Sequence, residues 1–381
     1  MTPQAQAQAR LLDRLEREHG KSVRKAFEKA VRELRGSVNL SALERAIRAG
    51  DIVAAMSVIG ISTPVFRDLE VEITRAFEGA GRAFTSLLSN RLRGPGAPLA
   101  QLRFDMRHPQ AIRWVEANAG QYVTNLAEDM REATIGQLRA EIARGIASDR
   151  DAQRAARRIA GLVDPSTGRR TGGVIGLSRP QTEYFNEMRA ALTVTPDRPL
   201  GVSGFDANGQ PIRKFWIKRD GTLGSTYGLR DRRFDPTIVR ALRDGQSLPA
   251  GKVEQMLNRY SDKMVMFRAR TIAETESLTA LEAGRFQSMQ QAIEDGAVPR
   301  QFVKNRWRHS GKREAREDHL RFSGTEVPWG EAFVLPSGAR MMFPRDSSLG
   351  AGASDIVKCG CMAEQVVDFL AIQEERERNA A

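Results

Sequence analysis

The chain has 381 residues, which is long enough for two or three domains with cores of their own. It is 41% hydrophobic and 6% aromatic, and this composition excludes a disordered chain. Lys and Arg number 59 against 47 Asp and Glu, so the formal net charge is +12. This excess of positive charge favours a polyanion such as nucleic acid, or an acidic protein, as a partner. Solubility alone is the simpler alternative.

Cysteine usage and the N-terminal sequence indicate where the protein is made. Two cysteines, Cys359 and Cys361, do not provide a disulfide framework, and a bridge between positions two apart would be strained. The first residues show no basic segment followed by an apolar one, so we expect no signal peptide. We also expect no membrane span, because no stretch approaches the roughly 18 uninterrupted apolar residues of such a span. A reducing cytoplasm is therefore the expected starting compartment.

Residues 1–163 carry apolar side chains at helical spacing, which predicts a helical domain held together by helix-on-helix burial. Capping boxes are expected where two of the helices begin, at Ser41 with Glu44 and at Ser148 with Asp151. The sequence R-G-P-G-A-P at 93–98 predicts a loop between helices. The helices are expected over about 3–34, 41–58, 63–92, 108–144 and 148–161.

Residues 164–250 have a different composition, and we expect them to form a basic region rich in loops and short strands. The Gly, Ser, Thr and Pro residues of 164–176 predict a loop or a domain boundary. A helix is predicted over 178–192, after which the helical period disappears. The segment K-F-W-I-K at 214–218 is a candidate strand.

The densest basic segment of the chain lies between Arg213 and Arg243, with nine Arg or Lys and three Asp. Aromatic residues are interleaved with these charges, a combination typical of surfaces that follow a nucleic-acid backbone. The equally weighted alternative is a loop whose arginines pair with acidic neighbours or serve solubility. The residues expected to contact DNA phosphates are Arg213, Lys214, Lys218, Arg219, Arg230, Arg232 and Arg233.

Residues 251–381 begin with a predicted long helix that reaches about Glu294, and both cysteines lie near the end of this segment. Thiolates and imidazoles are preferred zinc ligands, so a C-x-C pair downstream of a histidine indicates a candidate zinc site. The alternative is that the cysteines are two small buried apolar residues in a strand. The expected zinc ligands are His319, Cys359, Cys361 and Asp346, with His309 or water as alternatives for the fourth position.

Glu274 and Glu276 resemble the E-x-E motif of ADP-ribosyltransferases, in which the second glutamate activates the nucleophile and orients the ribose. Their surroundings predict a helix, on which residues two apart point to different sides. We therefore expect a structural role, in which Arg268 or Arg270 pairs with one of these glutamates. The chain also has no G-x-S-x-G, Walker A or H-E-x-x-H motif, and no catalytic residue is assigned.

The segment from about Leu229 to Cys361 resembles the phage head morphogenesis proteins, the minor capsid family typified by protein F of phage Mu. The run I-A-E-T-E at 272–276 matches the family's I-A-R-T-E helix, with Glu274 in place of arginine. Lys312, Glu314, Lys358 and Gly360 depart from the family's usual residues. The remaining landmarks are Trp307 for the family's strand, Arg316 and His319 for its R-x-x-H, Pro344 and Asp346 for its turn, and Cys359 and Cys361 for its closing cysteines.

The resemblance implies an α+β protein whose helical N-terminal part precedes a small mixed α/β domain over residues 251–381. It implies a low-copy structural protein of a phage or prophage head, without enzymatic activity. The implied partners are the portal, other head proteins and, non-specifically, double-stranded DNA during packaging or ejection, with no membrane in the folded precursor. Such a protein would be found in the host cytoplasm during assembly and then in the virion head.

The alternative function is a toxin-like ADP-ribosyltransferase or another transferase effector, because some relatives of the Mu F-like domain are fused to toxin domains. Glu276 distinguishes the two functions. A catalytic Glu276 would lie in a cleft wide enough for a nucleotide, whereas a structural Glu276 would be buried against an arginine on a neighbouring turn.

Overall fold

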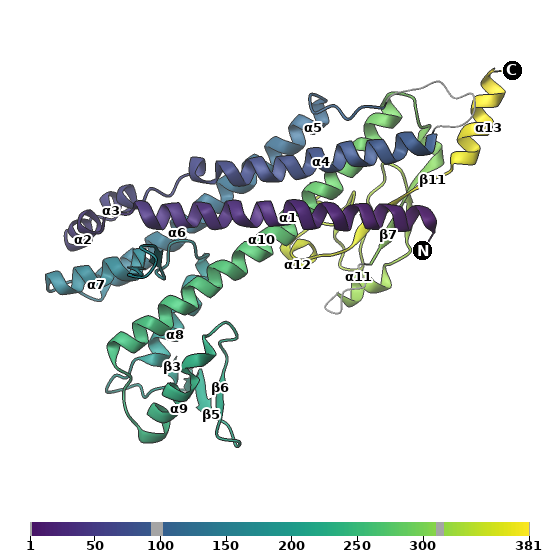
Figure 1. Ribbon diagram of the computed structural model, residues 1–381. Coiled ribbons are helices and arrows are strands. Elements are labelled where there is room, and N and C mark those ends of the chain that lie inside the picture. Colours follow the sequence, from purple (N-terminus) through teal and green to yellow (C-terminus); the bar gives the residue numbers. More distant parts are fainter. Residues whose placement is uncertain (1, 93–101, 310–315, 381) are drawn as a thin grey trace. The chain divides into compact units, whose positions relative to one another are not determined.

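The structure is a computed structural model that describes residues 2–92, 102–309 and 316–380 (Figure 1). It is mostly helical and adds small antiparallel sheets, which confirms the predicted α+β class. The predicted loop at 93–98 and the family departures Lys312 and Glu314 lie outside the described residues.

The chain forms two compact units, each built from segments that are far apart in the sequence. Unit 1 contains residues 1–27, 67–123 and 270–381, and unit 2 contains residues 28–66 and 124–269. These units differ from the three consecutive domains expected from composition. The reason is that two long helices, α1 (Pro3–Ser37) and α10 (Ala250–Glu294), each supply residues to both units.

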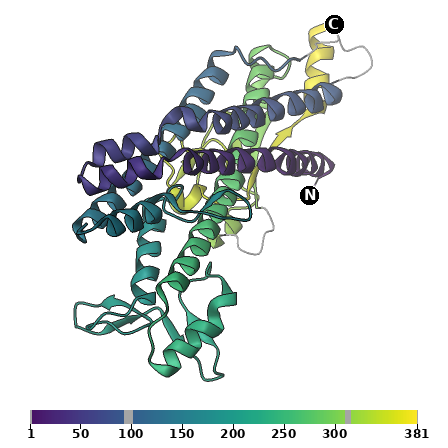
Figure 2. The same ribbon diagram turned by 60° about the vertical axis from the view of Figure 1, so that its left-hand side comes forward.

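The helical part of unit 1 is packed closely enough that a glycine is needed between two helices. A Cβ atom added at Gly284 of α10 would lie 2.1 Å from the carbonyl oxygen of Phe77 on α4 (Arg67–Leu92). Helices α1 and α4 also lie side by side (Figures 1 and 2), and His19 of α1 packs against Gly79 of α4. The other helical elements of this region are α5 (Pro109–Trp114), the π-helical turn Val115–Gly120 and the start of α6 (Gln121–Ala143).

The sheet of unit 1 has three antiparallel strands, with β7 (Val303–Arg308) between β11 (Met362–Val367) and β8 (Glu326–Pro328). Alternate residues of β7 are buried, and Trp307 is 0% exposed. Its ring packs edge-to-face against His319, with the ring centroids 5.5 Å apart. The smaller elements are η4 (Arg300–Phe302), α11 (Glu317–Arg321), β9 (Phe333–Val334), β10 (Arg340–Met341), α12 (Ala353–Ile356) and α13 (Phe369–Ala380).

The outer edge of β11 is covered by a side chain of α1. The backbone N–H of Gln365 donates to Oε1 of Gln8 at 3.0 Å, and Nε2 of Gln8 donates to the carbonyl oxygen of Gln365 at 2.8 Å. Nε2 of Gln4 donates to the same carbonyl at 3.2 Å. The N-terminal helix is thereby fixed to the C-terminal sheet.

Unit 2 is held by a buried carboxylate that joins three helices. Glu141 of α6 is 2% exposed and accepts hydrogen bonds from Arg144 at 2.7 Å and from Arg158 and Arg189 at 3.1 Å. Burial alone would raise the pKa of the Glu141 carboxyl, but these three guanidinium groups hold it below its ordinary value. The helices of this unit are α2 (Leu40–Arg48), α3 (Ile52–Ile59), η1 (Thr63–Phe66), α7 (Asp149–Ala160), α8 (Arg179–Leu192), η3 (Arg232–Phe234) and α9 (Asp235–Asp244).

Three short antiparallel hairpins complete the described part of unit 2. The middle of the predicted strand K-F-W-I-K is a strand, β5, as expected. The loop predicted over 164–176 contains part of one hairpin. The hairpins are β1 (Leu162–Val163) with β2 (Arg170–Thr171), β3 (Val202–Phe205) with β4 (Pro211–Arg213), and β5 (Phe215–Ile217) with β6 (Leu223–Ser225).

The capping box at Ser148 and Asp151 is confirmed, but the one predicted at Ser41 and Glu44 is wrong. The cap of α2 is Asn39, whose side chain accepts from the N–H of Ala42. The single helix expected over 41–58 is two helices, α2 and α3. They separate because Gly50 has a left-handed φ of 68° and Asp51 caps the second helix.

One helical stretch, Ile52–Leu92, is long and apolar enough by length and composition to cross a membrane. Gly60, with a left-handed φ of 73°, and the 3₁₀ turn η1 interrupt it. Its second part, α4, buries a face that includes Phe77 and Phe84. Core helices of globular proteins share this length and composition.

Candidate functional site

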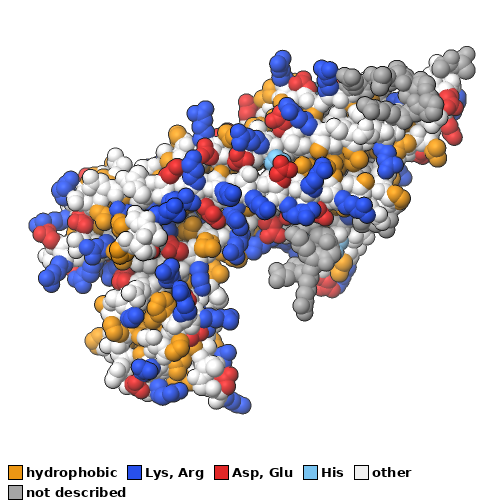
Figure 3. All heavy atoms as spheres, in the orientation of Figure 1, with side chains coloured by type: hydrophobic (Ala, Val, Ile, Leu, Met, Phe, Trp, Pro, Cys, Tyr) orange, Lys and Arg blue, Asp and Glu red, His pale blue; other side chains and the backbone are white. Residues whose placement is uncertain are grey.

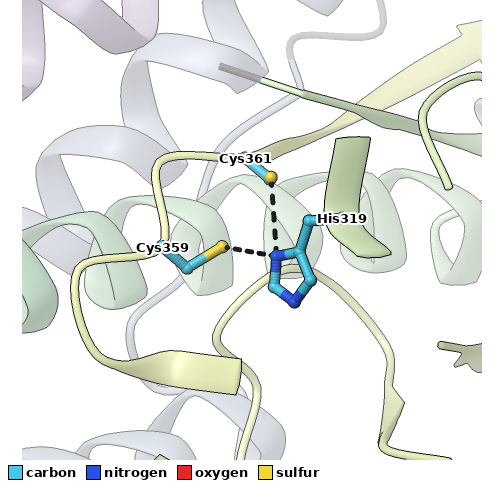
Figure 4. Close-up of side chains that lie close together, drawn as sticks. All are labelled: His319, Cys359 and Cys361. Atoms are coloured by element: carbon cyan, nitrogen blue, oxygen red, sulfur yellow. Dashed lines mark hydrogen bonds between the residues drawn. The ribbon is translucent and has the colours of Figure 1, made fainter. Parts of the chain in front are cut away.

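Two cysteines and a histidine from separate elements converge in unit 1, and we call these three residues the Cys–His cluster (Figure 4). Nδ1 of His319, on α11, lies 3.5 Å from Sγ of Cys359 and 3.8 Å from Sγ of Cys361. The exposed fractions of these residues are 1%, 2% and 3%. The structure thus brings together three of the residues that the sequence suggests as zinc ligands.

The cysteine loop is shaped by a buried arginine. Nη1 of Arg345 donates to the carbonyl oxygen of Cys359 at 2.5 Å and to that of Cys361 at 2.8 Å. Lys358, with a left-handed φ of 56°, donates its backbone N–H to Oγ1 of Thr275. Both ends of the C-x-C segment are thus fixed, and the two thiols point toward the same imidazole nitrogen.

Arg345 belongs to a buried charge network with two residues of α10. Glu282 lies 3.7 Å from the Arg345 guanidinium and 2.5 Å from that of Arg285, and all three side chains are at most 1% exposed. Arg285 also donates to the carbonyl oxygen of Ala363, at the start of β11. The network carries one net positive charge and contacts the cysteine loop through Arg345. This charge favours negative charge on the sulfur atoms.

The charges around the cluster shift the pKa values of its members. The pKa of the Cys359 thiol is lowered to about 3, although burial opposes this change. The causes are hydrogen bonds with Cys361 and His319 and the positive charge of Arg345. Burial alone would lower the pKa of His319, but Cys359 and the nearby aspartates Asp318 and Asp355 raise it above its ordinary value. Cys359 is therefore favoured as a thiolate, the form of cysteine that binds metals.

An aspartate that the sequence analysis did not identify lies on the far side of the imidazole. Oδ1 of Asp355 is 3.5 Å from Nε2 of His319, and the hydroxyl of Ser337 donates to that oxygen at 3.0 Å. Ser354 donates to the other carboxylate oxygen at 3.1 Å. The only feature of the sequence that could have indicated Asp355 is its position four residues before Cys359.

Two residues considered as the fourth zinc ligand lie outside the cluster. Asp346 accepts from the N–H groups of Met342 and Ser348, so its carboxylate stabilises its own turn. His309 lies at the end of β7, where its N–H donates to Ser323. Among the described residues, the side chains that could hold an ion together are His319, Cys359 and Cys361 on one side of the imidazole, and Asp318, His319 and Asp355 on the other.

A groove in unit 2 contains part of the predicted DNA-binding segment, and we call it the basic groove. Its volume is about 1090 Å³, and it lies between the β5–β6 hairpin and α9. Trp216, which is 39% exposed, lines it. The charged residues of its lining are Lys218, Arg230, Arg232, Asp235, Arg240, Arg243 and Asp244.

Three of the seven predicted phosphate contacts are paired with carboxylates. Lys214 lies 2.9 Å from Glu187, the Arg230 side chain makes two hydrogen bonds to Asp235, and the Arg233 side chain makes three to Asp231. The hydrogen bond from Arg233 lowers the pKa of Asp231 to about 2. The predicted residues that are exposed and make no ion pair within the described chain are Arg213, Lys218, Arg219 and Arg232.

Arg240 and Arg243 were not among the residues expected to contact DNA. Both lie on α9, line the basic groove and are exposed, with no ion pair in the part of the chain that the structure describes. Elsewhere, Lys and Arg side chains are spread over the visible face and do not gather in a single patch (Figure 3). The groove is therefore distinguished by the concave lining on which these cations gather, and less by the number of its charges.

Glu274 and Glu276 lie inside the uninterrupted helix α10, so they point to different sides of it as expected. Glu276 is only partly exposed, and burial raises the pKa of its carboxyl to about 8. Within the described residues, no ion pair joins Glu276 to an arginine. Arg268, one of the arginines considered as a partner, binds Asp129 at 2.6 Å. This geometry does not bring the two carboxylates together, as an E-x-E catalytic pair would require.

Comparison with known proteins shows that part of the chain is similar to a family. Residues 235–363 match the family model described as Phage Mu protein F like protein. The match covers α9, α10, the strands β7 and β8 and the whole Cys–His cluster. No curated protein and no solved structure matches the chain. The family is one of phage head morphogenesis proteins. Residues 235–363 are therefore a Phage Mu F-like region, as the resemblance predicted.

Proposed function

We propose that this protein is a structural minor head protein that contacts packaged DNA non-specifically through the basic groove. It would act beside the portal or inside the procapsid after assembly in the host cytoplasm. The observation that carries the DNA contact is the set of cations lining one groove that make no ion pair with any described residue, two of them on α9 at the start of the family-matched segment.

The charge of the groove favours a polyanion. Arg230 and Asp235 neutralise each other through two hydrogen bonds. The remaining charged residues of the lining are the cations Lys218, Arg232, Arg240 and Arg243 and the single acid Asp244. Cations on phosphates release counterions and give sequence-independent binding, which suits a protein enclosed with a genome of any sequence.

The surroundings of the groove also fit a nucleic-acid backbone. Trp216 provides an aromatic surface at the groove, and its neighbour Ile217 is 37% exposed. Aromatic side chains beside Arg and Lys contact sugars and bases without reading the sequence. An acidic surface of the portal or of another head protein is the competing occupant of the same groove.

The test measures binding of the full chain to a random-sequence duplex by fluorescence anisotropy over a series of salt concentrations. The groove variant combines Lys218→Gln, Arg232→Gln, Arg240→Gln and Arg243→Gln. A matched control makes the same charge change on exposed residues of α1, with Arg10→Gln, Arg14→Gln, Lys21→Gln and Lys25→Gln.

We expect the groove variant to reduce the slope of log affinity against log salt by roughly 3–4, since each phosphate contact contributes about 0.9. The control should change the slope much less. Equal losses in both variants would mean that DNA responds only to net charge, and the groove would not be its site. Absence of binding by the wild-type chain would reject DNA as the ligand and favour an acidic head protein.

A further inference from the structure

We propose that the Cys–His cluster binds one zinc ion through Nδ1 of His319 and the thiolates of Cys359 and Cys361. This inference is independent of DNA binding. Its first support is the convergence of two sulfur atoms on one nitrogen, at 3.5 and 3.8 Å. An imidazole nitrogen has one lone pair or one hydrogen and makes a single well-aligned hydrogen bond, so only one of the two sulfur atoms can take it. A metal ion bound to that nitrogen can be coordinated by both sulfur atoms as well.

The distances agree with tetrahedral coordination. Zinc binds sulfur at about 2.3 Å and imidazole nitrogen at about 2.0–2.1 Å, which places S and N roughly 3.6 Å apart in a tetrahedron. The observed 3.5 and 3.8 Å lie on either side of this value. All three ligand atoms lie within 4.8 Å of one another, so they can surround one ion without rearrangement of the backbone.

The far side of the histidine is arranged as in many metal sites. Ligating histidines usually direct their second nitrogen at a carboxylate, which fixes the ring and makes it a better ligand. Nε2 of His319 faces Oδ1 of Asp355 at 3.5 Å, and Ser337 holds that carboxylate. Asp355 would therefore position the histidine and would not bind the ion itself.

The thiols are held in place by contacts that do not involve the ion. Arg345 fixes the carbonyl oxygens of both cysteines, so the loop is preorganised. Zinc with two thiolates is electrically neutral, so its burial does not add a net charge to the interior. Sulfur and imidazole ligands select zinc over magnesium or calcium, which prefer oxygen.

Deep burial argues for a structural ion. With the three ligands at most 3% exposed, a substrate would have little access to the fourth coordination position, which a water molecule could occupy. The ion would link α11 to the loop before β11, two segments separated by 40 residues between His319 and Cys359. It would strengthen a region whose sheet has only three strands.

The experiment measures zinc in the tag-free full chain after reconstitution under reducing conditions, and the absorption spectrum after loading with cobalt instead. We expect one zinc per chain and an intense thiolate-to-cobalt charge-transfer band. Cys359→Ser combined with Cys361→Ser should abolish both. Asp346→Asn and His309→Gln are matched controls outside the cluster and should keep full stoichiometry.

Asp355→Asn separates positioning from ligation. It should retain one zinc at saturation but weaken its affinity about 10–100-fold, as loss of an outer partner does. If the double serine variant does not fold, the cobalt spectrum of the wild-type chain decides alone. Zinc well below one per chain in the reconstituted wild type, or a cobalt spectrum without thiolate bands, would overturn the proposal.

Discussion

Nη1 of Arg345 donates a 2.5 Å hydrogen bond to the carbonyl oxygen of Cys359, and both residues are buried. The buried Arg345 thus fixes the backbone that carries the cysteine side chains. The same guanidinium faces Glu282 at 3.7 Å, so the cysteine loop and α10 depend on one cation. Removing it would deprive the two cysteine carbonyl oxygens of this donor and leave Arg285 as the cation beside Glu282.

Arg345→Met should lower the free energy of unfolding by about 3–5 kcal/mol, which is the usual cost of removing one partner of a buried ion pair. Urea denaturation followed by circular dichroism measures the change. Arg340→Gln, at an exposed position nearby, should stay within about 0.5 kcal/mol of the wild type. Similar stability of the two variants would mean that the loop is held by other contacts.

Glu141→Gln should destabilise the chain at neutral pH because Arg144, Arg158 and Arg189 lose their common carboxylate. The pKa of Glu141 is depressed in the folded state, so its stabilisation is present above the ordinary glutamate pKa and disappears as pH falls through the folded value. The difference between wild type and variant should therefore shrink with acidification. Glu132→Gln, which is exposed on the same helix, should show no such pH dependence.

Gly284→Ala should destabilise the chain by about 1–3 kcal/mol, since its Cβ would lie 2.1 Å from the carbonyl oxygen of Phe77 and the helices must separate. Gly136→Ala is the matched control, because no atom lies within 4 Å of the added Cβ in α6. It should stabilise by about 0.5–1 kcal/mol through helix propensity. Thermal or urea unfolding of both variants gives the comparison, and an unchanged Gly284 variant would contradict the close approach of α4 and α10.

Asp244→Asn should strengthen binding of a random duplex several-fold at low salt, because it removes the one unpaired acid from the lining of the basic groove. Asp197→Asn makes the same charge change at an exposed position outside that lining. The two variants are compared by anisotropy at one salt concentration. If they bind equally tightly, the gain comes from net charge and the groove has no special role.

The sequence predicted those parts of the fold that depend on local chemistry. The helix from Ser148 follows from a side chain that bonds its own backbone three residues on. The strand at Phe215–Ile217 follows from aromatic and branched residues between turns. The cap of α2 was missed because Asn39 and Ser41 are both good N-cap residues two positions apart, and the choice between them depends on backbone geometry.

The candidate sites were predictable only where one segment carries the chemistry. The C-x-C pair and its histidine were found because cysteine and histidine are rare in this chain. Asp355 was not, since it is one acid among 47 acidic residues and acquires its role from the fold. The same applies to Lys214, whose partner Glu187 lies 27 residues away on α8. A count of charged residues does not show which of them pair in space, because the pairing depends on the fold.

The two hydrogen bonds between Gln8 and Gln365 have a consequence for the protein among its neighbours. Strand β11 is an edge of its sheet among the described strands, and a bare edge can recruit a strand from another chain. The amide of Gln8 presents the donor and acceptor that such an intruding strand would offer. Because the backbone groups of Gln365 are already bonded, this edge offers a strand of a second molecule fewer free groups with which to pair.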